Sequence, residues 1–154
     1  MTAVRAPIAG HVLALADVPD PVFSAGMVGD GLAVSPAENA GRITVTSPIA
    51  GELVKVHPHA FVVVAESGVG VLVHVGLDTV GLKGRGFEVR EDEGAVVEAG
   101  QPVLDVDVEA VVAAGLSPIC PVVVLDTKPG DLGDLAVGGE VAAQGPLFQI
   151  PDPA

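Results

Sequence analysis

Residues 57–75 read HPHAFVVVAESGVGVLVHV, and this stretch indicates most directly how the chain folds. Two apolar runs rich in β-branched residues, at 59–65 and 69–75, flank a polar turn that includes Glu66 and Gly68. Such runs on either side of a glycine-containing polar turn are typical of a β-hairpin. We therefore predict two antiparallel strands, with a histidine near the open end of each.

The register of this hairpin decides how the two histidines are related. If the turn is centred between Glu66 and Ser67, His59 lies directly opposite His74. Their Cβ atoms are then expected about 4.5–5.5 Å apart on one face of the sheet. A loop with an even number of residues keeps this register, whereas a loop with an odd number breaks it.

The rest of the chain shows similar short apolar runs separated by turns. The 20 Gly and 13 Pro residues are scattered, which favours many short strands over long helices. We expect further strands at 43–46, 53–57, 86–90, 103–106, 121–125 and 147–150. A short helix is expected at 107–114, with Asp107 as its N-cap, and a helical turn at 131–136. The predicted fold class is all-β, an antiparallel sandwich or partly closed barrel with one or two short helices.

We expect residues 1–154 to form one domain, because the length suits a single core and no linker is visible. The sequence APIAG at 6–10 has a close echo, SPIAG, at 47–51. Each copy places a turn between short apolar runs. This echo favours two related β units packed face to face.

The net charge of −13 argues against binding to nucleic acid or to an anionic membrane, and favours a basic partner. The one cysteine, Cys120, lies in an apolar run and cannot form an internal disulfide. The opening residues have no apolar segment of signal-peptide length, and the longest uncharged stretch, 110–125, is too short to span a membrane. We therefore expect a cytoplasmic protein without a membrane anchor.

Two facing imidazoles at the end of an apolar hairpin allow three interpretations. They are structural side chains, ligands of a metal ion, or partners in nucleophilic chemistry. In the third case, one neutral ring takes a phosphoryl group on nitrogen and the other donates hydrogen bonds to the phosphoryl oxygens, at about 1.5–3 kcal/mol each. The hairpin pattern by itself leaves these interpretations open.

Longer motifs point to a known family. The segment LVHVGLDTV at 72–80, followed by LKGRGF at 82–87, resembles the phosphorylation segment of glucose-family IIA proteins of the sugar phosphotransferase system. Other segments resemble the same family, namely HAF at 59–61, VPDPVF at 18–23, MVGDG at 27–31, SP at 117–118 and PVV at 121–123. The resemblance covers nearly the whole chain and identifies it as a member in a stand-alone, single-domain form.

The resemblance implies a duplicated β motif and a phosphocarrier. By this match His74 accepts the phosphoryl group and His59 stabilises it. The phosphorylated carrier protein HPr is the implied donor. A cysteine on the IIB domain of a IIB/IIC transporter for glucose, N-acetylglucosamine or a related sugar is the implied acceptor. No organic cofactor is implied.

The same match implies a docking surface around the histidines. Its apolar rim comprises Val22, Phe23, Met27, Val28 and Leu72, and the carboxylates of Asp20 and Asp78 meet an arginine of the partner.

One departure from the family lies beside His59. An enteric member has a threonine shortly before its supporting histidine, whereas this chain has His57 and Pro58. His57 either takes over a hydrogen bond to His59 or is exposed, and we favour the hydrogen bond.

Two other classes of function remain open. His57-x-His59 and His74-x-x-x-Asp78 resemble zinc-ligand motifs of lysostaphin-type endopeptidases, although in reversed order. Zinc bound by His59 and His74 alone would need a third ligand. Residues 97–104 resemble a biotinyl or lipoyl module, but the hairpin tip has no lysine to carry the cofactor.

Overall fold

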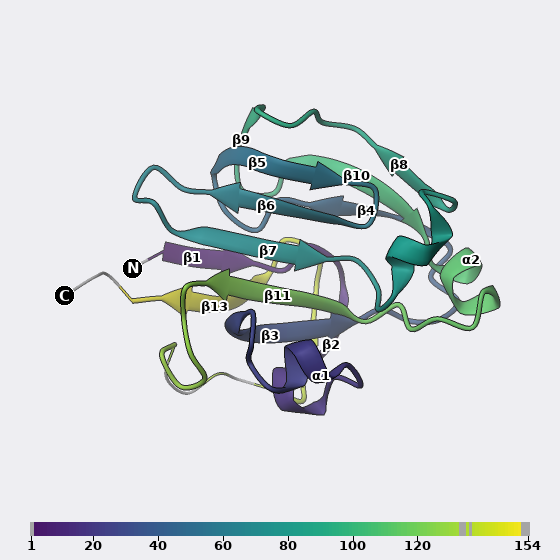
Figure 1. The fold of residues 1–154 in the computed structure, drawn as a ribbon, viewed down its shortest axis with the longest axis horizontal. Helices are drawn as coiled ribbons and strands as arrows, with labels where there is room; N and C mark the ends of the chain where they lie inside the picture. The colour runs from purple at the N-terminus through teal and green to yellow at the C-terminus, as the bar shows by residue number, and fades with distance from the viewer. Residues whose placement is uncertain (1, 133–134, 136, 152–154) are drawn as a thin grey trace.

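The computed structural model describes residues 2–132, 135 and 137–151, and its fold is shown in Figure 1. Its strands are β1 (Thr2–Arg5), β2 (Gly10–Ala14), β3 (Gly29–Ser35), β4 (Arg42–Thr46), β5 (Gly51–His57), β6 (Ala60–Val64), β7 (Gly70–His74), β8 (Phe87–Val89), β9 (Val96–Val97), β10 (Pro102–Asp107), β11 (Cys120–Leu125), β12 (Glu140–Val141) and β13 (Pro146–Ile150). Short helices lie between them, namely α1 (Pro21–Ser24), α2 (Val108–Ala113) and the 3-10 helices η1 (Leu15–Asp17) and η2 (Thr79–Leu82).

The strands form three antiparallel sheets. The largest has eight strands in the order β12-β2-β3-β11-β7-β6-β5-β9. A second sheet has the order β4-β10-β8, and β1 pairs with β13. In Figure 1 the large sheet curls across the front of the molecule, and the two smaller sheets lie behind it. This curled antiparallel arrangement confirms the predicted all-β fold class.

The main core lies between the large sheet and the smaller ones. Along β6 and β7 every second side chain is fully buried, and these residues pack in one cluster with Leu104 of β10. The inward-facing residues are Phe61, Val63, Val71 and Val73. Complete burial of side chains of this size contributes about 1.5–3 kcal/mol each. The residues between them, including Leu72 and His74, therefore face outward.

A smaller apolar cluster lies against η1 and α1. Phe23 of α1 is buried there against neighbours from several elements, namely Leu15, Val18, Ala33, Leu77 and Val123, with Leu13, Val28, Leu72 and Ile119 packed around them. Because Leu72 faces outward on β7, this cluster reaches the same face of the sheet as His74.

Most of the predicted elements are present. The strands expected at 43–46, 53–57, 86–90, 103–106, 121–125 and 147–150 correspond to β4, β5, β8, β10, β11 and β13, with ends that differ by at most two residues. The helix expected at 107–114 is α2, and the Asp107 side chain caps it by accepting the N–H of Ala110. The helical turn expected at 131–136 falls partly on residues outside the described ones.

The predicted register of the β6–β7 hairpin is wrong by one residue. Ala60, and not His59, lies opposite His74. The loop holds residues 65–69, and it is closed by hydrogen bonds from the Ala65 N–H to the Val69 carbonyl and from the Gly68 N–H to the Ala65 carbonyl, both 2.8 Å. This odd-numbered loop centres the turn on Ser67 and shifts every pair.

Candidate functional site

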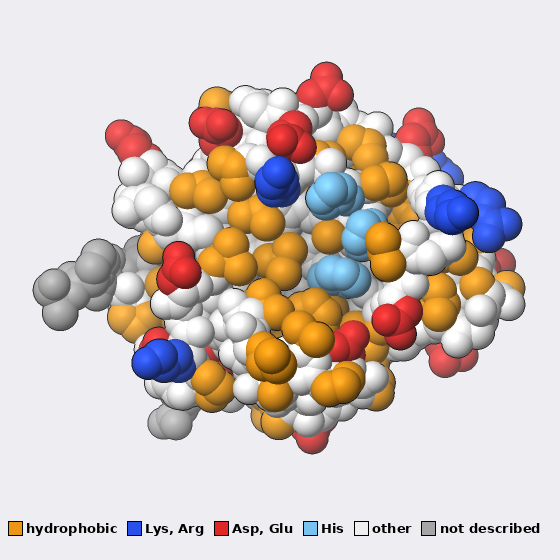
Figure 2. Space-filling view, in the orientation of Figure 1, with side chains coloured by type: hydrophobic (Ala, Val, Ile, Leu, Met, Phe, Trp, Pro, Cys, Tyr) orange, Lys and Arg blue, Asp and Glu red, His pale blue; other side chains and the backbone are white. Residues whose placement is uncertain are grey.

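Three of the four histidines gather on one face of the protein. His57 ends β5, His74 ends β7, and His59 lies in the Pro58–His59 turn that joins β5 to β6. Because β5, β6 and β7 are neighbours in the sheet, their ends bring the three side chains together. Figure 2 shows the histidines as a column among hydrophobic side chains, with most acidic side chains farther out.

His59 and His74 are adjacent despite the corrected register. Their ring centroids are 5.3 Å apart and the ring planes meet at 70°, an edge-to-face arrangement. His59 lies in a two-residue turn and not in a strand, so its side chain does not follow the alternation of β6. Its carbonyl accepts the Val75 N–H at 2.7 Å, which keeps its backbone beside the end of β7.

The imidazole of His74 is fixed by one short hydrogen bond. Its Nδ1 lies 2.6 Å from the carbonyl oxygen of Gly76. A carbonyl only accepts hydrogen bonds, so Nδ1 carries the proton and donates it. In the neutral ring, Nε2 is then left with a free electron pair. Nε2 of His74 is therefore the ring nitrogen that is able to act as a nucleophile.

The turn after β7 depends on glycine at position 76. Gly76 has a φ of +81°, which places its carbonyl back towards the His74 ring. A Cβ at this position would come within 2.5 Å of Cγ2 of Thr79. Thr79 is itself held, because its hydroxyl donates to the Val75 carbonyl at 2.7 Å. A side chain at position 76 would thus disturb the group that orients His74.

Both paired histidines have a pKa below the ordinary value for this residue. Burial has the largest effect on the pKa of His74, while the hydrogen bond to Gly76 and the carboxylates of Asp20 and Asp78 raise it in part. Burial also lowers the pKa of His59, followed by repulsion from His74 and from His57. Both rings are therefore mainly neutral near pH 7, and each has one donor and one free nitrogen.

His57 contacts His59 through its ring face. The two ring centroids are 5.7 Å apart and the planes are nearly parallel, at 25°. Among the described residues no hydrogen bond joins the two rings, so the expected hydrogen bond is replaced by stacking. His57 is also exposed, which was the alternative expectation.

Helix α1 supplies much of the apolar surface beside the histidines. The rings of Phe23 and His74 pack edge to face, with centroids 5.3 Å apart and planes at 61°. Phe23 is buried, whereas Val22 and Met27 are 47% and 76% exposed. Asp20 is the N-cap of α1 and accepts the Val22 N–H at 2.9 Å.

A family model described as "phosphoenolpyruvate-dependent sugar phosphotransferase system, EIIA 1" matches residues 2–129. The chain belongs to this EIIA family. Among similar EIIA-containing proteins, the N-acetylglucosamine-specific EIICBA component of Escherichia coli (strain K12) is 43% identical over 149 residues. Its counterpart in Klebsiella pneumoniae is 42% identical over 147 residues. Each match covers 94% of this chain but 22% of the relative, so the chain spans less than a quarter of these proteins.

Shorter EIIA relatives match over most of their length. The glucose-specific EIIA component of Bacillus cereus is 38% identical over 137 residues, covering 88% of this chain and 81% of that protein. The structure titled glucose permease IIA from Mycoplasma capricolum superposes with a TM-score of 0.83 at 34% identity, covering 95% and 93% of the two chains. A deep-sea M23 metalloprotease, pseudoalterin, superposes with a TM-score of 0.58 at 10% identity, which is a likeness of fold alone.

These findings confirm the resemblance to the glucose-family IIA proteins. As a member of the EIIA family, the chain is a component of the phosphoenolpyruvate-dependent sugar phosphotransferase system. The zinc hydrolase and the biotinyl or lipoyl module are not supported. Within the described ranges, no group of three or more His, Cys, Asp or Glu side chains is arranged to hold a metal ion. The described part of this EIIA chain also contains no helix with the length and apolarity needed to cross a membrane.

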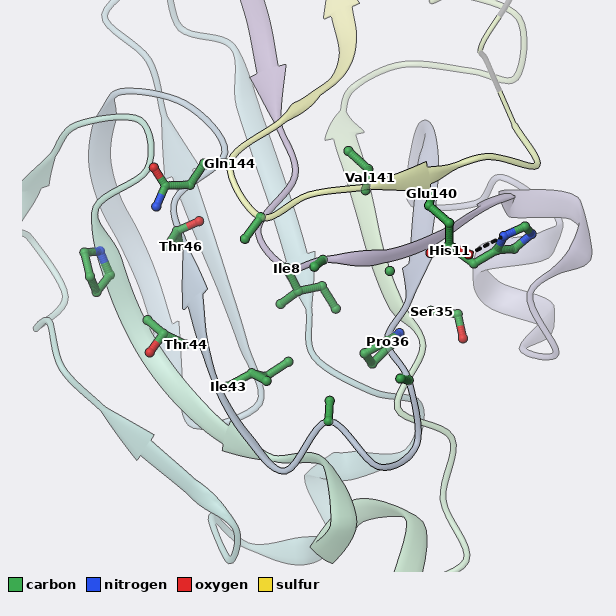
Figure 3. A pocket seen from close by; sticks show the side chains of 16 residues that line it. Ile8, His11, Ser35, Pro36, Ile43, Thr44, Thr46, Glu140, Val141 and Gln144 are labelled. Carbon is green, nitrogen blue, oxygen red and sulfur yellow. Dashed lines mark hydrogen bonds and ion pairs between the residues drawn. The ribbon is translucent and has the colours of Figure 1, made fainter.

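A sizeable groove of the EIIA chain lies apart from the three histidines. Figure 3 shows this groove, which has a volume of about 960 Å³ and is lined mainly by β2, β4, β12 and their flanking loops. The fourth histidine, His11, lies there with its Nδ1 3.3 Å from Oε1 of Glu140. None of the three clustered histidines lines the groove, so the groove and the histidine cluster are separate features of the surface.

Sequence reasoning missed two parts of the EIIA site. The first is the carbonyl of Gly76, whose only signal is a glycine two residues after His74 in the motif HVG. The second is α1, a helix too short to show any periodicity, although Asp20-Pro21 is a typical helix start.

Proposed function

We propose that this protein accepts a phosphoryl group from phosphorylated HPr on Nε2 of His74 and passes it to a cysteine of a IIB domain. The hydrogen bond from Nδ1 of His74 to the Gly76 carbonyl carries this proposal, because it leaves Nε2 as the free nitrogen. The acceptor belongs to a transporter of the glucose and N-acetylglucosamine group, in keeping with the names of the relatives.

Each transfer is a displacement at phosphorus. The electron pair on Nε2 of His74 attacks the donor's phosphohistidine, a new N–P bond forms, and the donor's N–P bond breaks with its electron pair returning to the donor imidazole. In the second step the cysteine thiolate of the IIB domain forms an S–P bond, and the Nε2–P bond breaks. His59 donates an N–H to a phosphoryl oxygen, which is worth about 1.5–3 kcal/mol when the acceptor is charged.

Both partners use the apolar surface next to His74. Phe23, Val28 and Leu72 form its base, and the exposed side chains of Val22 and Met27 form its contact points. Methionine is flexible and polarizable, so one surface adapts to two different partners. Asp20 and Asp78 are close enough to affect His74 electrostatically, and we assign them to pairing with an arginine of the partner.

We further propose that residues 1–154 act as one IIA domain and that both transfers take place in the cytoplasm. The family match over residues 2–129 and the shared core support a single domain. Cys120 is a fully buried free thiol, in keeping with a reducing compartment.

Phosphorylation in a reconstituted system tests the assignment of His74. With phosphoenolpyruvate, enzyme I and HPr, we expect one phosphoryl group per chain in an acid-labile, alkali-stable linkage. His74→Gln removes the nucleophile and should abolish labelling. His11→Gln, at a histidine outside the site, should label normally. Normal labelling of His74→Gln would contradict the proposed function.

A further inference from the structure

The rings of His74 and His59 are held in different ways. His74 is oriented by its hydrogen bond to Gly76. The ring nitrogens of His59 form no hydrogen bond with any residue in the described part of the chain. Its ring is held by packing alone, between the edge-to-face contact with His74 at 5.3 Å and the stacked ring of His57 at 5.7 Å. The orientation of His59 therefore depends on these two neighbours.

A β-bulge in β5 turns His57 towards this site. Leu53 pairs with Val63 and Lys55 pairs with Val62, so Val54 is an extra residue in β5. Leu53 is fully buried, and strict alternation would also turn residues 55 and 57 inward. The bulge reverses the alternation, and Lys55 and His57 are exposed. His57 thus reaches the outward face on which His74 lies.

The strand pairing leaves space for the ring of His59. His57 lies opposite Ala60, and Ala60 lies opposite His74, so the three residues form a row across β5, β6 and β7. Neighbouring strands are about 4.8 Å apart, which separates the backbones of the two outer residues by about 10 Å. Alanine is too small to fill that gap, and the ring of His59 enters it from the turn.

The turn itself is stiff. Pro58 lies between the two stacked histidines, and its ring fixes the backbone φ near −65°. The loop after η2 passes near this turn, because a Cβ built on Gly84 would lie 3.5 Å from Cγ of Pro58. The proline restrains the backbone between the two histidines, whose rings stack with centroids 5.7 Å apart.

We propose that His57 is a positioning residue, whose ring face holds the imidazole of His59 towards His74 during phosphoryl transfer. This inference rests on the proposed function. A His59 ring free to rotate would spend part of its time in solvent, away from the phosphoryl oxygens. Loss of such orientation lowers the rate of a catalysed step without removing any reacting group.

The test compares two substitutions of the same residue. His57→Ala removes the ring, whereas His57→Phe keeps a flat aromatic ring without nitrogen atoms. His11→Ala is the matched control, because it removes a histidine outside the site. The measurement is the steady-state rate of phosphoryl transfer from the full chain to the IIB domain, resolved into kcat and KM.

We expect His57→Ala to lower kcat about tenfold with little change in KM, and His57→Phe to restore most of the loss. Equal kcat values for the native chain and His57→Ala would overturn the proposal. So would a loss that phenylalanine does not restore, because the ring nitrogens would then matter. A change confined to KM would make His57 a partner contact, which also contradicts the proposal.

Nuclear magnetic resonance separates this inference from the proposed function. In the native chain and in His57→Phe, we expect nuclear Overhauser contacts between the ring protons of His59 and His74. In His57→Ala these contacts should weaken, while the contacts across β6 and β7 persist and show that the fold is intact. If His74 accepts no phosphoryl group, the proposed function fails. If the His59–His74 contacts are unchanged in His57→Ala, the positioning role of His57 fails.

Discussion

The proposed function gives His74 and His59 different roles, and their surroundings suit these roles. A hydrogen bond fixes the tautomer of His74 and leaves Nε2 free, which suits an acceptor of the phosphoryl group. The ring nitrogens of His59 bond to no described residue, so its N–H is available for a phosphoryl oxygen. The low pKa of each ring keeps a neutral imidazole present until a phosphoryl group arrives.

Replacement of His59 should affect the two transfers unequally. We expect His59→Gln to accept phosphoryl from HPr at a rate within about threefold of the native rate, because Nε2 of His74 is intact. Transfer to the IIB domain should fall by about 100-fold, because the glutamine amide cannot become charged as it donates to the phosphoryl group. Both rates, from HPr and to the IIB domain, are measured with labelled phosphate in reactions that are stopped after set times. Normal transfer to IIB would count against the stabilising role of His59.

At the scale of single residues, the sequence was enough to identify both histidines but not the register of the strands beside them. The register of the hairpin depends on whether Val64 pairs with Gly70, as it does in the structure, or with Val69, as the predicted register requires, and the composition of the turn suits either pairing. The prediction of facing residues was wrong, yet the rings meet because His59 lies in a turn. Side chains in a turn escape strand alternation, so the register did not decide the contact.

At the scale of elements, the orientation of His74 depends on the turn after β7 as well as on the strand itself. Gly76 combines a positive φ with a close approach to Thr79, and its carbonyl orients His74. Gly68 in the β6–β7 loop also has a positive φ, of +94°, but a Cβ there would meet no atom within 4 Å. Alanine at position 68 would therefore meet backbone strain alone, whereas alanine at position 76 would meet backbone strain and a steric clash with Thr79.

Alanine substitutions at these two glycines should differ in stability. Gly68→Ala is expected to lose about 1 kcal/mol of unfolding free energy from the left-handed backbone alone. Gly76→Ala should lose about 2–4 kcal/mol, because its Cβ also meets the Thr79 side chain. Urea unfolding of both variants measures the difference. Equal losses would show that the approach to Thr79 has no energetic importance.

The sequence predicted elements well where β-branched runs lie between glycine turns, as in β6, β7, β10 and β11. It placed short strands around the turn at 6–10 without giving ranges for β1 and β2, and it gave no prediction for β3 or α1. In β3, Gly29 and Gly31 stand where an added Cβ would come within 2.1 Å and 2.0 Å of carbonyl oxygens in β11. A strand that needs glycine for such close approach does not show the composition of a strand.

At the scale of the whole molecule, the charge of the protein and the position of its site act together. The net charge is −13, and Figure 2 shows acidic side chains around the margin of the face that carries the three histidines.

The order of strands in the large sheet joins segments far apart in sequence, such as β3, β11 and β7. Local pattern does not contain this order, so sequence reasoning gave the fold class and not the topology.

The acidic surface should make phosphoryl acceptance sensitive to salt. For a basic donor, we expect kcat/KM to fall about tenfold between about 0.01 M and 0.15 M salt, because screening shortens the range of attraction from about 30 Å to about 8 Å. The value of kcat at saturating donor should change little. Initial rates over a series of salt concentrations check this, and a kcat/KM independent of salt would exclude electrostatic steering.

The central claim is that the Gly76 carbonyl holds the proton of His74 on Nδ1 and leaves Nε2 to take the phosphoryl group. Long-range ¹H–¹⁵N spectra of the histidine-labelled protein, recorded before and after phosphorylation, test it most directly. We predict a protonated Nδ1 in both states and a phosphorus coupling to Nε2 of His74 afterwards. A phosphoryl group on Nδ1 of His74, or on any other histidine, would contradict the claim.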